Sequence, residues 1–585
     1  MDYIRTKIIS TIGPAVNSKE KIVELIKAGM NVARLNFSHG THDQHLQTIQ
    51  YLKEAREELN VPLAIMLDTK GPEIRLGKVK GDALQVKPGQ TLKIVPSLEK
   101  NDGSQITINP FSVLETVQKG MKILFDDGYV ISTVVKKSDS ETIVEIQNHG
   151  ILKSNKGVNI PDAELNLPAM TKKDVEDLIF GCSHDIDIVA ASFIRSSEHV
   201  LEIKELMHKQ GKSDILVIAK IENKQGVDNF DSILQASDGI MIARGDLGVE
   251  LDLSTVPKLQ KMMIKKCYHS CRPVVTATQM LESMILNPRP TRAEVSDVAN
   301  AIYDSSSAVM LSGETAVGNY PIEAVQQMRS IAKSTEDDFD YKEFFKEQSY
   351  REYHDVSSSV ALAAVKTAYS ANAKAIFAYT SSGFTAKLMS RLRPSMPIFA
   401  LTQNKKIYYQ LAFVWGVVPI YVESCKNKSE AFSIVKKFAL ERNFLHFGDL
   451  VVITAGSPFG KIGSTNMMIV ESIGDVLVRG KNGVGHKVGG EVKIILSPEG
   501  YSPFETEDKL VVIPRCDNSF LPLLKHAKGI ILQNSANDYS SEKYAMLVAK
   551  TFDLPAIIRA DSALDTLKEG EIVTLDPKKG LIYRG

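Results

Sequence analysis

Two apolar segments of this 585-residue chain each lead into charged residues whose types and spacing suit phosphoryl chemistry. The run 215–219 ends in Lys220, and Glu222 follows two positions later. A second run, 239–243, is followed by Asp246. A lysine and two carboxylates held together could bind a divalent metal beside a charged phosphoryl group. Charged side chains have little packing use at the ends of strands buried on both faces, which favours function over structure.

Similar segments recur along the first 340 residues and would position these groups. Amphipathic helical patterns fill most of the intervals between them, as at 18–29 and 45–59. The predicted strands are 6–13, 31–38, 62–70, 185–193, 215–223, 239–248, 272–280 and 307–316. Eight successive βα units predict an α/β fold, a (β/α)8 TIM barrel with its active site at the carboxyl ends of the strands. A doubly wound open sheet is the alternative, and the count argues for closure.

The long interval between the third and fourth strands predicts an inserted domain. It carries short alternating segments with turn signals at 81–95, 121–135 and 141–150. We expect a small all-β domain over 71–167 that acts as a lid on a barrel made of 1–70 and 168–342.

Two further units follow the barrel. Apolar runs at 373–383, 397–403, 417–424 and 449–458 alternate with helical stretches. They predict an open α/β domain over 343–475. The glycine-rich stretch 479–490 is interpreted as a linker to an extra swivelling-type α/β domain over 486–585.

Bulk composition argues against several classes of partner. With 70 basic and 70 acidic residues, the chain has no net charge to attract nucleic acid or an acidic membrane. No run approaches the ~18 apolar residues of a membrane span, and the first residues lack the apolar core of a signal peptide. Its five cysteines are few and scattered, which is typical of a reducing compartment. We therefore expect a soluble, cytoplasmic protein that binds neither nucleic acid nor membrane.

The residues at the strand ends form a coherent chemical set. Strand by strand they are Arg34, Asn36 and Ser38; Asp68, Thr69 and Arg75; Lys220, Glu222, Gly245 and Asp246; and Thr276, Thr278, Ser312 and Glu314. Glu222 and Asp246 are hard oxygen ligands that suit Mg²⁺ or Mn²⁺, although ordinary ion pairs would also explain them. Lys220 and Arg34 would neutralise an anionic substrate. Hydroxyls such as those of Thr278 and Ser312 remain for proton delivery through water.

A second group of donors suits a monovalent cation. Asn36, Ser38, Asp68 and Thr69 offer oxygen atoms but only one negative charge. Helix-capping and turn roles explain the asparagine and the serine equally well. Gly245 would let backbone N–H groups approach an anion closely.

Six segments in this order resemble the pyruvate kinase family, over about residues 1–475. They are MNVARLNFSHG (30–40), LDTKGPEIR (67–75), IAKIEN (218–223), ARGDLG (243–248), TATQMLESM (276–284) and MLSGETAVG (310–318). The family transfers the phosphoryl group of phosphoenolpyruvate to ADP, which gives pyruvate and ATP. The resemblance implies Mg²⁺ (or Mn²⁺) and K⁺ as cofactors and a homotetramer as the assembly.

The resemblance also implies a role for each strand-end residue. Lys220, Arg34 and Thr278 would be catalytic, with Thr278 also implicated in protonating the enolate, and Gly245 and Asp246 would complete the substrate contacts. Mg²⁺ would be held by Glu222 and Asp246, K⁺ by Asn36, Ser38, Asp68 and Thr69, and the nucleotide by Asn36, His39, Arg75 and Lys156. His39 taken alone is more typical of an ordinary polar histidine. Glu73 is the residue type of K⁺-dependent members, so we expect a K⁺ requirement.

The third unit resembles the effector domain of that family. Thr380, Ser381, Ser382, Gly383 and Thr385 precede a predicted helix over 386–393. Hydroxyls and backbone N–H groups at a helix N-terminus form an anion site, although plain helix capping is the alternative. The loop 460–466 is a candidate second wall. A phosphorylated small-molecule effector is the expected ligand.

The fourth unit resembles the mobile phosphohistidine domain of enzymes that use phosphoenolpyruvate, such as pyruvate phosphate dikinase, through 540–558. The alignment places Tyr544 where that family has its phosphate-carrying histidine, and neither His486 nor His526 is near. We therefore expect a structural or interface role. A dikinase-like relay through a tail histidine is one alternative, and the missing histidine argues against it. A non-catalytic metabolite sensor is another, and the complete strand-end set argues against that.

Overall fold

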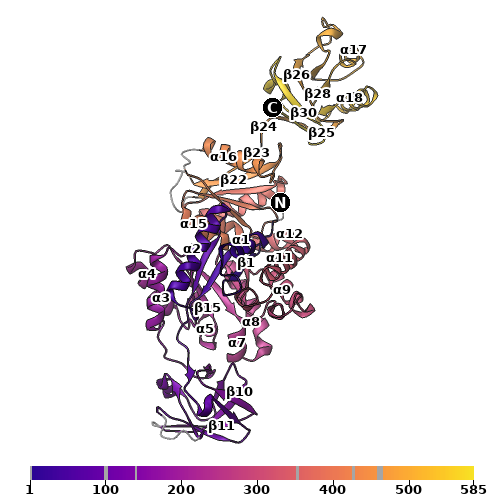
Figure 1. Ribbon diagram of the computed structural model, residues 1–585. Coiled ribbons are helices and arrows are strands. Elements are labelled where there is room, and N and C mark those ends of the chain that lie inside the picture. Colours follow the sequence, from indigo (N-terminus) through magenta and orange to yellow (C-terminus); the bar gives the residue numbers. More distant parts are fainter. Residues whose placement is uncertain are drawn as a thin grey trace.

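A computed structural model describes residues 3–97, 103–138, 141–350, 355–423, 428–456 and 465–584, and within them eight parallel strands close into a barrel (Figure 1). Around the barrel they follow the order β1, β18, β17, β16, β15, β14, β3, β2. Their bounds are β1 (Lys7–Thr11), β2 (Val32–Asn36), β3 (Ala64–Asp68), β14 (Ile188–Ala191), β15 (Leu216–Ile221), β16 (Gly239–Ala243), β17 (Val274–Ala277) and β18 (Ala308–Leu311). Each lies inside one predicted run, so the barrel is confirmed and the open-sheet alternative is wrong.

Helices separate the strands, as the amphipathic patterns predict. α1 (Lys19–Ala28) is capped by the Ser18 side chain and ends at Gly29, whose φ of 132° suits glycine. α2 (His42–Glu58) begins before residue 45 because a capping box closes its first turn. The other helices of this part are α3 (Lys172–Ser183), α4 (Ser197–Lys209), α5 (Lys224–Asp228), α6 (Phe230–Ala236), α7 (Arg244–Glu250), α8 (Val256–His269), α9 (Arg292–Tyr303), α10 (Gly313–Ala316), α11 (Pro321–Asp338) and α12 (Tyr341–Ser349).

Apolar side chains fill the barrel interior, which is therefore a packed core rather than a pore. Ile9, Met66 and Met241 are among its fully buried residues. Phe413, from the short 3₁₀ turn η5 (Leu411–Phe413) of the next unit, joins this cluster. It packs near Gly239, the first residue of β16, and so closes the amino end. Ligands must therefore enter at the carboxyl end of the strands.

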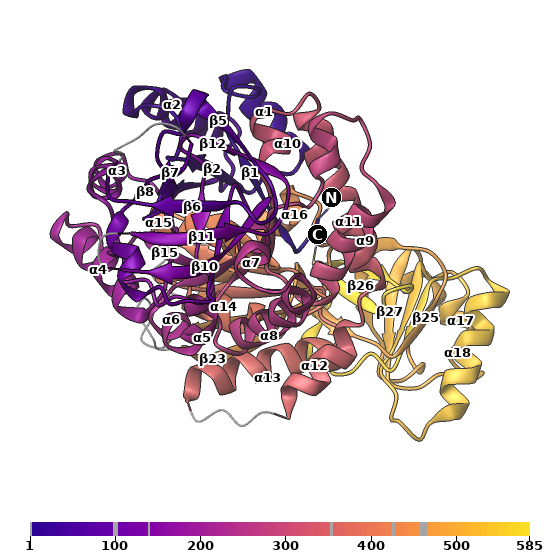
Figure 2. The same cartoon turned by 90° about the horizontal axis from the view of Figure 1, so that it is seen from below.

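The predicted all-β insert is confirmed, and it stands at the carboxyl end of the barrel (Figure 1). Its main sheet has the order β13, β9, β10, β11, β6, β7 and encloses a separate apolar core. The strands are β4 (Arg75–Leu76), β5 (Ala83–Val86), β6 (Thr91–Ile94), β7 (Gln105–Ile106), β8 (Ile108–Asn109), β9 (Lys122–Phe125), β10 (Val130–Lys137), β11 (Thr142–Ile146), β12 (Gly150–Lys153) and β13 (Val158–Asn159). In Figure 2 this unit lies in front of the barrel.

The third unit is the predicted open α/β domain. Its sheet has the order β21, β20, β19, β22, β23. The elements are α13 (Val356–Ser370), β19 (Ala375–Tyr379), α14 (Phe384–Ser390), β20 (Ile398–Thr402), α15 (Lys405–Gln410), β21 (Val417–Tyr421), α16 (Lys428–Glu441), β22 (Leu450–Gly456) and β23 (Thr465–Ser472). The antiparallel β23 was not predicted. The ends of the predicted strands 417–424 and 449–458 lie outside the described residues.

The predicted linker over 479–490 is wrong, because this stretch belongs to the sheet of the fourth unit. The order is β24, β31, β30, β26, β27, β28, β29, β25. The elements are β24 (Asp475–Arg479), β25 (Asn482–Val484), β26 (Val488–Ile494), β27 (Lys509–Ile513), α17 (Leu521–Leu524), β28 (Gly529–Leu532), α18 (Tyr539–Thr551), β29 (Ala556–Ile558), α19 (Ala563–Thr566), β30 (Ile572–Asp576) and β31 (Leu581–Arg584). Its glycines serve close packing: a Cβ on Gly483 would lie 2.4 Å from the Pro577 carbonyl oxygen.

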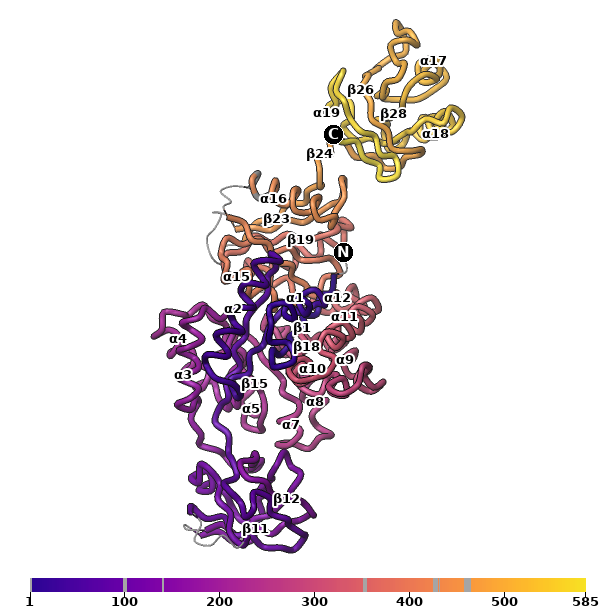
Figure 3. The backbone as a smooth tube through the Cα atoms, in the orientation of Figure 1, coloured from indigo at the N-terminus to yellow at the C-terminus, as the bar shows by residue number. Residues whose placement is uncertain are grey.

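The fourth unit lies beyond the α/β unit, at the far end of the molecule from the insert (Figure 3). Phe447 and Tyr583 stack across this junction with ring centroids 5.7 Å apart, and Lys579 Nζ donates to the Phe447 carbonyl at 2.8 Å. Across the described part of the chain, no helix combines the length and the apolar character needed to cross a membrane.

Candidate active site

Lys220 lies in a buried hydrogen-bonded cluster at the carboxyl ends of β3, β14 and β15. Its Nζ donates to Asp68 Oδ1 at 3.1 Å and to Ser192 Oγ at 2.7 Å, and it lies 3.0 Å from Glu222 Oε1. Burial alone would lower the pKa of Lys220, but the charges of Asp68 and Glu222 outweigh burial and raise it. The lysine therefore stays charged, as a group that stabilises a phosphoryl oxygen must.

Arg34 is the second cation of this cluster. Its Nε donates to Asp68 Oδ2 at 2.6 Å and its Nη1 to Thr11 Oγ1 at 2.9 Å. Burial would raise the pKa of Asp68, but Arg34 and Lys220 hold that pKa below its usual value. Arg34 and Lys220 share Asp68, and Lys220 also pairs with Glu222, so this cluster sets two cations against two carboxylates.

Glu222 and Asp246 face a cavity of about 230 Å³ between the barrel and the insert. Glu222 is only 2% exposed, and its Oε2 accepts a hydrogen bond from the Phe193 backbone N–H at 2.6 Å. Burial, and then the nearby charge of Glu222, raises the pKa of Asp246 to about 7. A divalent cation would relieve the repulsion between the Glu222 and Asp246 carboxylates, so these two oxygen ligands fit Mg²⁺. Among the described residues, no group of three or more acidic, histidine or cysteine side chains that could hold a metal ion occurs.

The loop after β17 holds Thr278 in an unusual backbone conformation. Its φ is 66°, which is uncommon for a β-branched residue. Thr278 Oγ1 donates to the Ala277 carbonyl at 2.6 Å and accepts from the Gly245 N–H at 2.9 Å. Arg244 Nη2 donates to the Thr278 carbonyl at 2.8 Å. The Gly245 N–H, which we expected to meet an anion, is therefore used to orient the threonine hydroxyl.

The predicted monovalent-cation donors lie together at the ends of β2 and β3. Asn36 and Asp68 are register partners on these two strands. Asn36 Oδ1 accepts from the Ser38 N–H at 3.1 Å, and the Thr69 carbonyl accepts from Ser192 Oγ at 2.6 Å. These neutral oxygens beside one carboxylate have the chemistry that K⁺ binding needs.

The predicted nucleotide residues divide into two places. Arg75 and Lys156, both from the insert, line the same cavity as Glu222 and Asp246. Arg75 Nη2 lies 2.5 Å from Glu73 Oε2. Lys156 Nζ lies 2.9 Å from Asp126 Oδ1, and this contact raises the lysine's pKa. Asn36 and His39 are not among the lining residues, and His39 is exposed in the loop after β2.

Sequence reasoning missed Ser192, although it lies near the end of the predicted strand 185–193 and directly follows β14. Ser192 Oγ donates at 3.2 Å to Asp68 Oδ1, which also accepts from Lys220. The Ser192 backbone N–H donates to Thr69 Oγ1 at 3.1 Å. Applying the strand-end rule to the run 185–193 would have found it. Arg195, Asp126, Asp127 and Glu250 also line the cavity and were missed, because no strand-end pattern marks them.

Two predicted strand-end side chains, those of Glu314 and Thr276, have structural contacts, and Ser312 takes part through its backbone N–H. Glu314 accepts from the backbone N–H groups of Ser312 at 2.7 Å and Leu281 at 3.0 Å, and burial raises its pKa. The Thr276 hydroxyl pairs with that of Ser306 at 2.7 Å. These buried hydrogen bonds hold neighbouring loops together.

The predicted effector loop differs from expectation at its helix. α14 begins at Phe384 rather than at residue 386, so Thr385 lies inside the helix and Gly383 precedes it with a φ of 78°. The buried Thr385 hydroxyl lies 2.5 Å from that of Thr465, so it is already paired. Thr380 is buried, while Ser381 and Ser382 are half-buried. Residues 460–464 of the candidate second wall lie outside the described residues.

The fourth unit places Tyr544 in α18, where its hydroxyl donates to Asn518 Oδ1. His486 lies between β25 and β26, and His526 follows α17. Both histidines are exposed. Neither histidine belongs to α18, the helix that holds Tyr544.

Comparison with known proteins identifies every unit except the insert by name. The family model "Pyruvate kinase, barrel domain" matches residues 3–325, "Pyruvate kinase, alpha/beta domain" matches 358–471, and "PEP-utilising enzyme, mobile domain" matches 505–580. Pyruvate kinases of Geobacillus stearothermophilus and Bacillus licheniformis are 41% and 40% identical to this chain, over 99% of each sequence. A crystal structure of a pyruvate kinase from Cryptosporidium parvum is 37% identical, with a TM-score of 0.77 over 80% of this chain and 96% of that one. The chain is therefore a phosphotransferase that belongs to the pyruvate kinase family and carries a PEP-utilising mobile domain after its alpha/beta domain.

Proposed function

We propose that the chain transfers the phosphoryl group of phosphoenolpyruvate to ADP at the carboxyl end of the barrel, in the cytoplasm. The observation that carries the proposal is the charged Lys220, held by Asp68, Ser192 and Glu222, of which Glu222 lines the cavity. Family membership implies phosphoenolpyruvate and ADP as substrates. The positive charges of Arg34 and Lys220 would hold the anionic groups of these substrates.

In this proposal Arg34 and Lys220 bind the phosphoryl oxygens and stabilise the charge that develops during transfer. Glu222 and Asp246 would hold Mg²⁺ or Mn²⁺, which supplies further charge neutralisation when bound. Asn36, Ser38, Asp68 and Thr69 would hold K⁺ in the same way. Thr278, oriented by Gly245, would relay a proton from water to the enolate after transfer, so that water is the proton source and the threonine hydroxyl is restored.

The insert contributes the nucleotide side of the cavity. Arg75 and Lys156 would meet the phosphates of ADP, and Asn36 and His39 would contact the nucleotide from the barrel side. Asn159 Nδ2 of the insert donates to Glu250 Oε1 of the barrel at 2.8 Å, so the two units already touch at the cavity edge. Closure of the insert as a lid would exclude water from the transfer.

Regulation and assembly belong to the same proposal. Thr380, Ser381, Ser382 and Gly383 would bind a phosphorylated effector ahead of α14, with the paired Thr385 supporting the loop. The subunits would form a homotetramer. The proposed boundaries 1–70, 71–167, 168–342 and 343–475 can be checked by limited proteolysis. The fourth unit, proposed over 486–585, should be protected from β24 onwards, because β24 and β25 belong to its sheet.

The test is a coupled assay of pyruvate formation from phosphoenolpyruvate and ADP, run with and without Mg²⁺ and K⁺. We expect turnover only with a divalent cation and a large further increase with K⁺. Lys220→Ala should abolish it, while Lys209→Ala, at an exposed lysine that pairs with Glu205, should not. Metal-independent turnover would remove the assigned roles of Glu222 and Asp246.

A further inference from the structure

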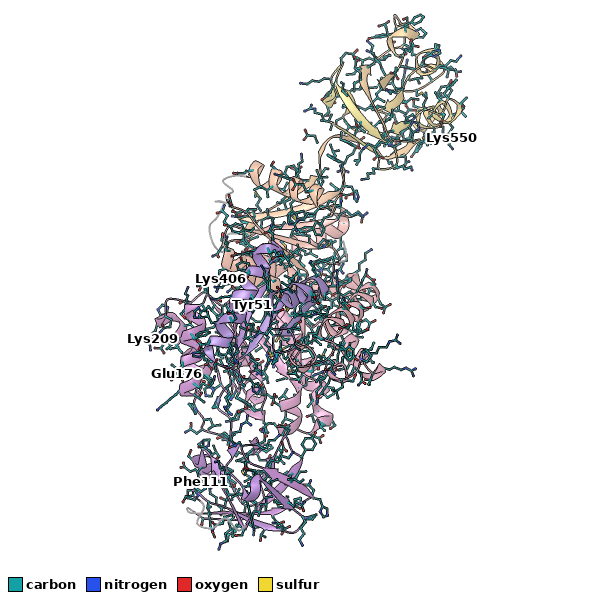
Figure 4. The ribbon with its side chains drawn as sticks, in the orientation of Figure 1. Tyr51, Phe111, Glu176, Lys209, Lys406 and Lys550 are labelled. Carbon is teal, nitrogen blue, oxygen red and sulfur yellow. The ribbon has the colours of Figure 1, made fainter. Side chains whose placement is uncertain are left out.

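The short helix α15 of the α/β unit donates hydrogen bonds to the barrel at the end opposite the candidate active site. Lys406 Nζ donates to the Ile186 carbonyl and lies 3.5 Å from Asp187 Oδ1. One turn later, Gln410 Nε2 donates to the carbonyls of Asp187 at 3.1 Å and Asp214 at 2.6 Å. Figure 4 labels Lys406 where the α/β unit meets the barrel.

Asp187 connects these contacts to the neighbouring strand β3. The residue is 1% exposed, and its Oδ2 accepts from the Ile65 N–H at 2.9 Å and from Arg56 Nη1 at 3.1 Å. The Arg56 guanidinium lies 3.5 Å over the ring of Tyr409, which again belongs to α15. A buried carboxylate with such partners fixes the surrounding backbone, because moving any partner leaves a charge unpaired.

The strands held in this way are the ones that carry the central cluster. Ile65 lies in β3, Asp187 immediately precedes β14, and Asp214 precedes β15. These three strands are neighbours in the barrel, in the order β15, β14, β3. At their other ends lie Asp68, Ser192 and Lys220, which are mutually hydrogen-bonded. Each strand is a short, extended, fully paired segment, so a shift at one end is carried to the other.

Ile407 of the same helix and Leu411 of η5 contact the loop that precedes α14. Gly383 packs so closely that a Cβ there would lie 3.3 Å from Leu411 Cδ2 and 3.5 Å from Ile407 Cγ2. The next turn, η5, inserts Phe413 into the barrel core. The segment 405–413 therefore lies between that loop and the amino ends of the three strands.

We propose that α15 is a positioning element for the phosphoryl-transfer cluster, with Lys406 and Gln410 fixing the axial positions of β14 and β15. Lys406 touches no substrate, and its effect reaches Lys220 through Ser192 and the Ser192–Phe193 backbone. Loss of the Lys406 contacts lets β14 shift, which loosens the hydrogen bonds from Ser192 to Thr69 and from Phe193 to Glu222. The kinetic part of this inference rests on the proposed function, whereas the structural part does not.

The test compares Lys406→Met with Lys406→Arg and Lys405→Met in the full-length protein. Lys406→Met keeps the apolar stem but loses the donor, Lys406→Arg keeps a donor, and Lys405 is an exposed neighbour on the same helix. We expect Lys406→Met to lower kcat by about threefold to thirtyfold with the KM for phosphoenolpyruvate little changed. Lys406→Arg should recover most of this loss, and Lys405→Met should match the wild type.

Amide hydrogen exchange supplies a readout independent of activity. In Lys406→Met, exchange should quicken in peptides covering residues 188–196 while peptides from β1 and β18 keep the wild-type rate. Wild-type exchange at 188–196 together with wild-type kcat would overturn the inference even if the chain is an active pyruvate kinase. Uniformly faster exchange across the barrel would also overturn it, because Lys406 would then serve general stability. If the wild-type chain lacks the proposed activity, the proposed function fails, and the exchange comparison still decides the structural part.

Discussion

The two ends of the barrel both bury charged side chains, but they use them differently. At the amino end, Lys7 Nζ donates to the Val417 carbonyl at 2.8 Å, and Asp187 is enclosed by Ile65, Arg56 and Lys406. At the carboxyl end, Glu222, which pairs with Lys220, lines a cavity of about 230 Å³ together with Asp246. Buried charge alone therefore does not mark a functional site. Charge whose partners are incomplete and which faces a cavity does.

The largest expected effect comes from removing the lysine at the carboxyl end. Lys220→Ala should lower kcat by at least about 10³-fold, because charge stabilisation of the transferring group is lost. Steady-state kinetics should show a nearly unchanged KM for phosphoenolpyruvate. A variant whose main defect is a raised KM would instead show that Lys220 binds the ground state.

Removing one carboxylate should have the next largest effect. Asp246→Asn should lower kcat/KM by about 10²-fold and require more Mg²⁺ for half-maximal activity, because one hard ligand becomes neutral. Mg²⁺ titration of the activity and direct Mn²⁺ binding both measure this. An unchanged Mg²⁺ requirement would place the metal elsewhere.

A smaller effect is expected from the insert side of the cavity. Lys156→Ala should raise the KM for ADP by about tenfold and leave the KM for phosphoenolpyruvate unaltered, since one phosphate contact is lost. Lys153→Ala is the matched control, because Lys153 is exposed on β12 of the same unit and does not line the cavity. Equal effects of the two variants would argue against the assigned nucleotide role.

The smallest effect on turnover is expected at the amino end, where the consequence should be pH-dependent stability. Burial lowers the pKa of Lys7 from 10.5 to about 8, against a weaker opposing effect of Glu336. Between these values the unfolded chain binds a proton that the folded protein does not, so the contribution of Lys7 to stability rises with pH. The Tm of the wild type should therefore increase relative to that of Lys7→Met from pH 7 to pH 10. A difference in Tm that does not change with pH would contradict this.

The comparison of the two ends also shows what the sequence could predict. Strand-end residues such as Lys220, Asp246 and Asn36 were predictable because parallel strands bring their carboxyl ends to one edge. The amino-end contacts of Lys406 and Gln410 were not, because they depend on how two separate units pack. The stretch 479–490 was misjudged for a related reason: its glycines permit close packing, such as that of Gly483 against Pro577, which only the folded sheet reveals.

The most direct test of the central claim is a ³¹P NMR time course of phosphoenolpyruvate and ADP with Mg²⁺ and K⁺. The wild type should convert the phosphoenolpyruvate signal into the γ-phosphate signal of ATP. The same conversion should persist in a His486→Gln, His526→Gln double variant and should vanish in Lys220→Ala. Transfer that survives in Lys220→Ala but stops in the double variant would contradict the account and place the chemistry on a tail histidine.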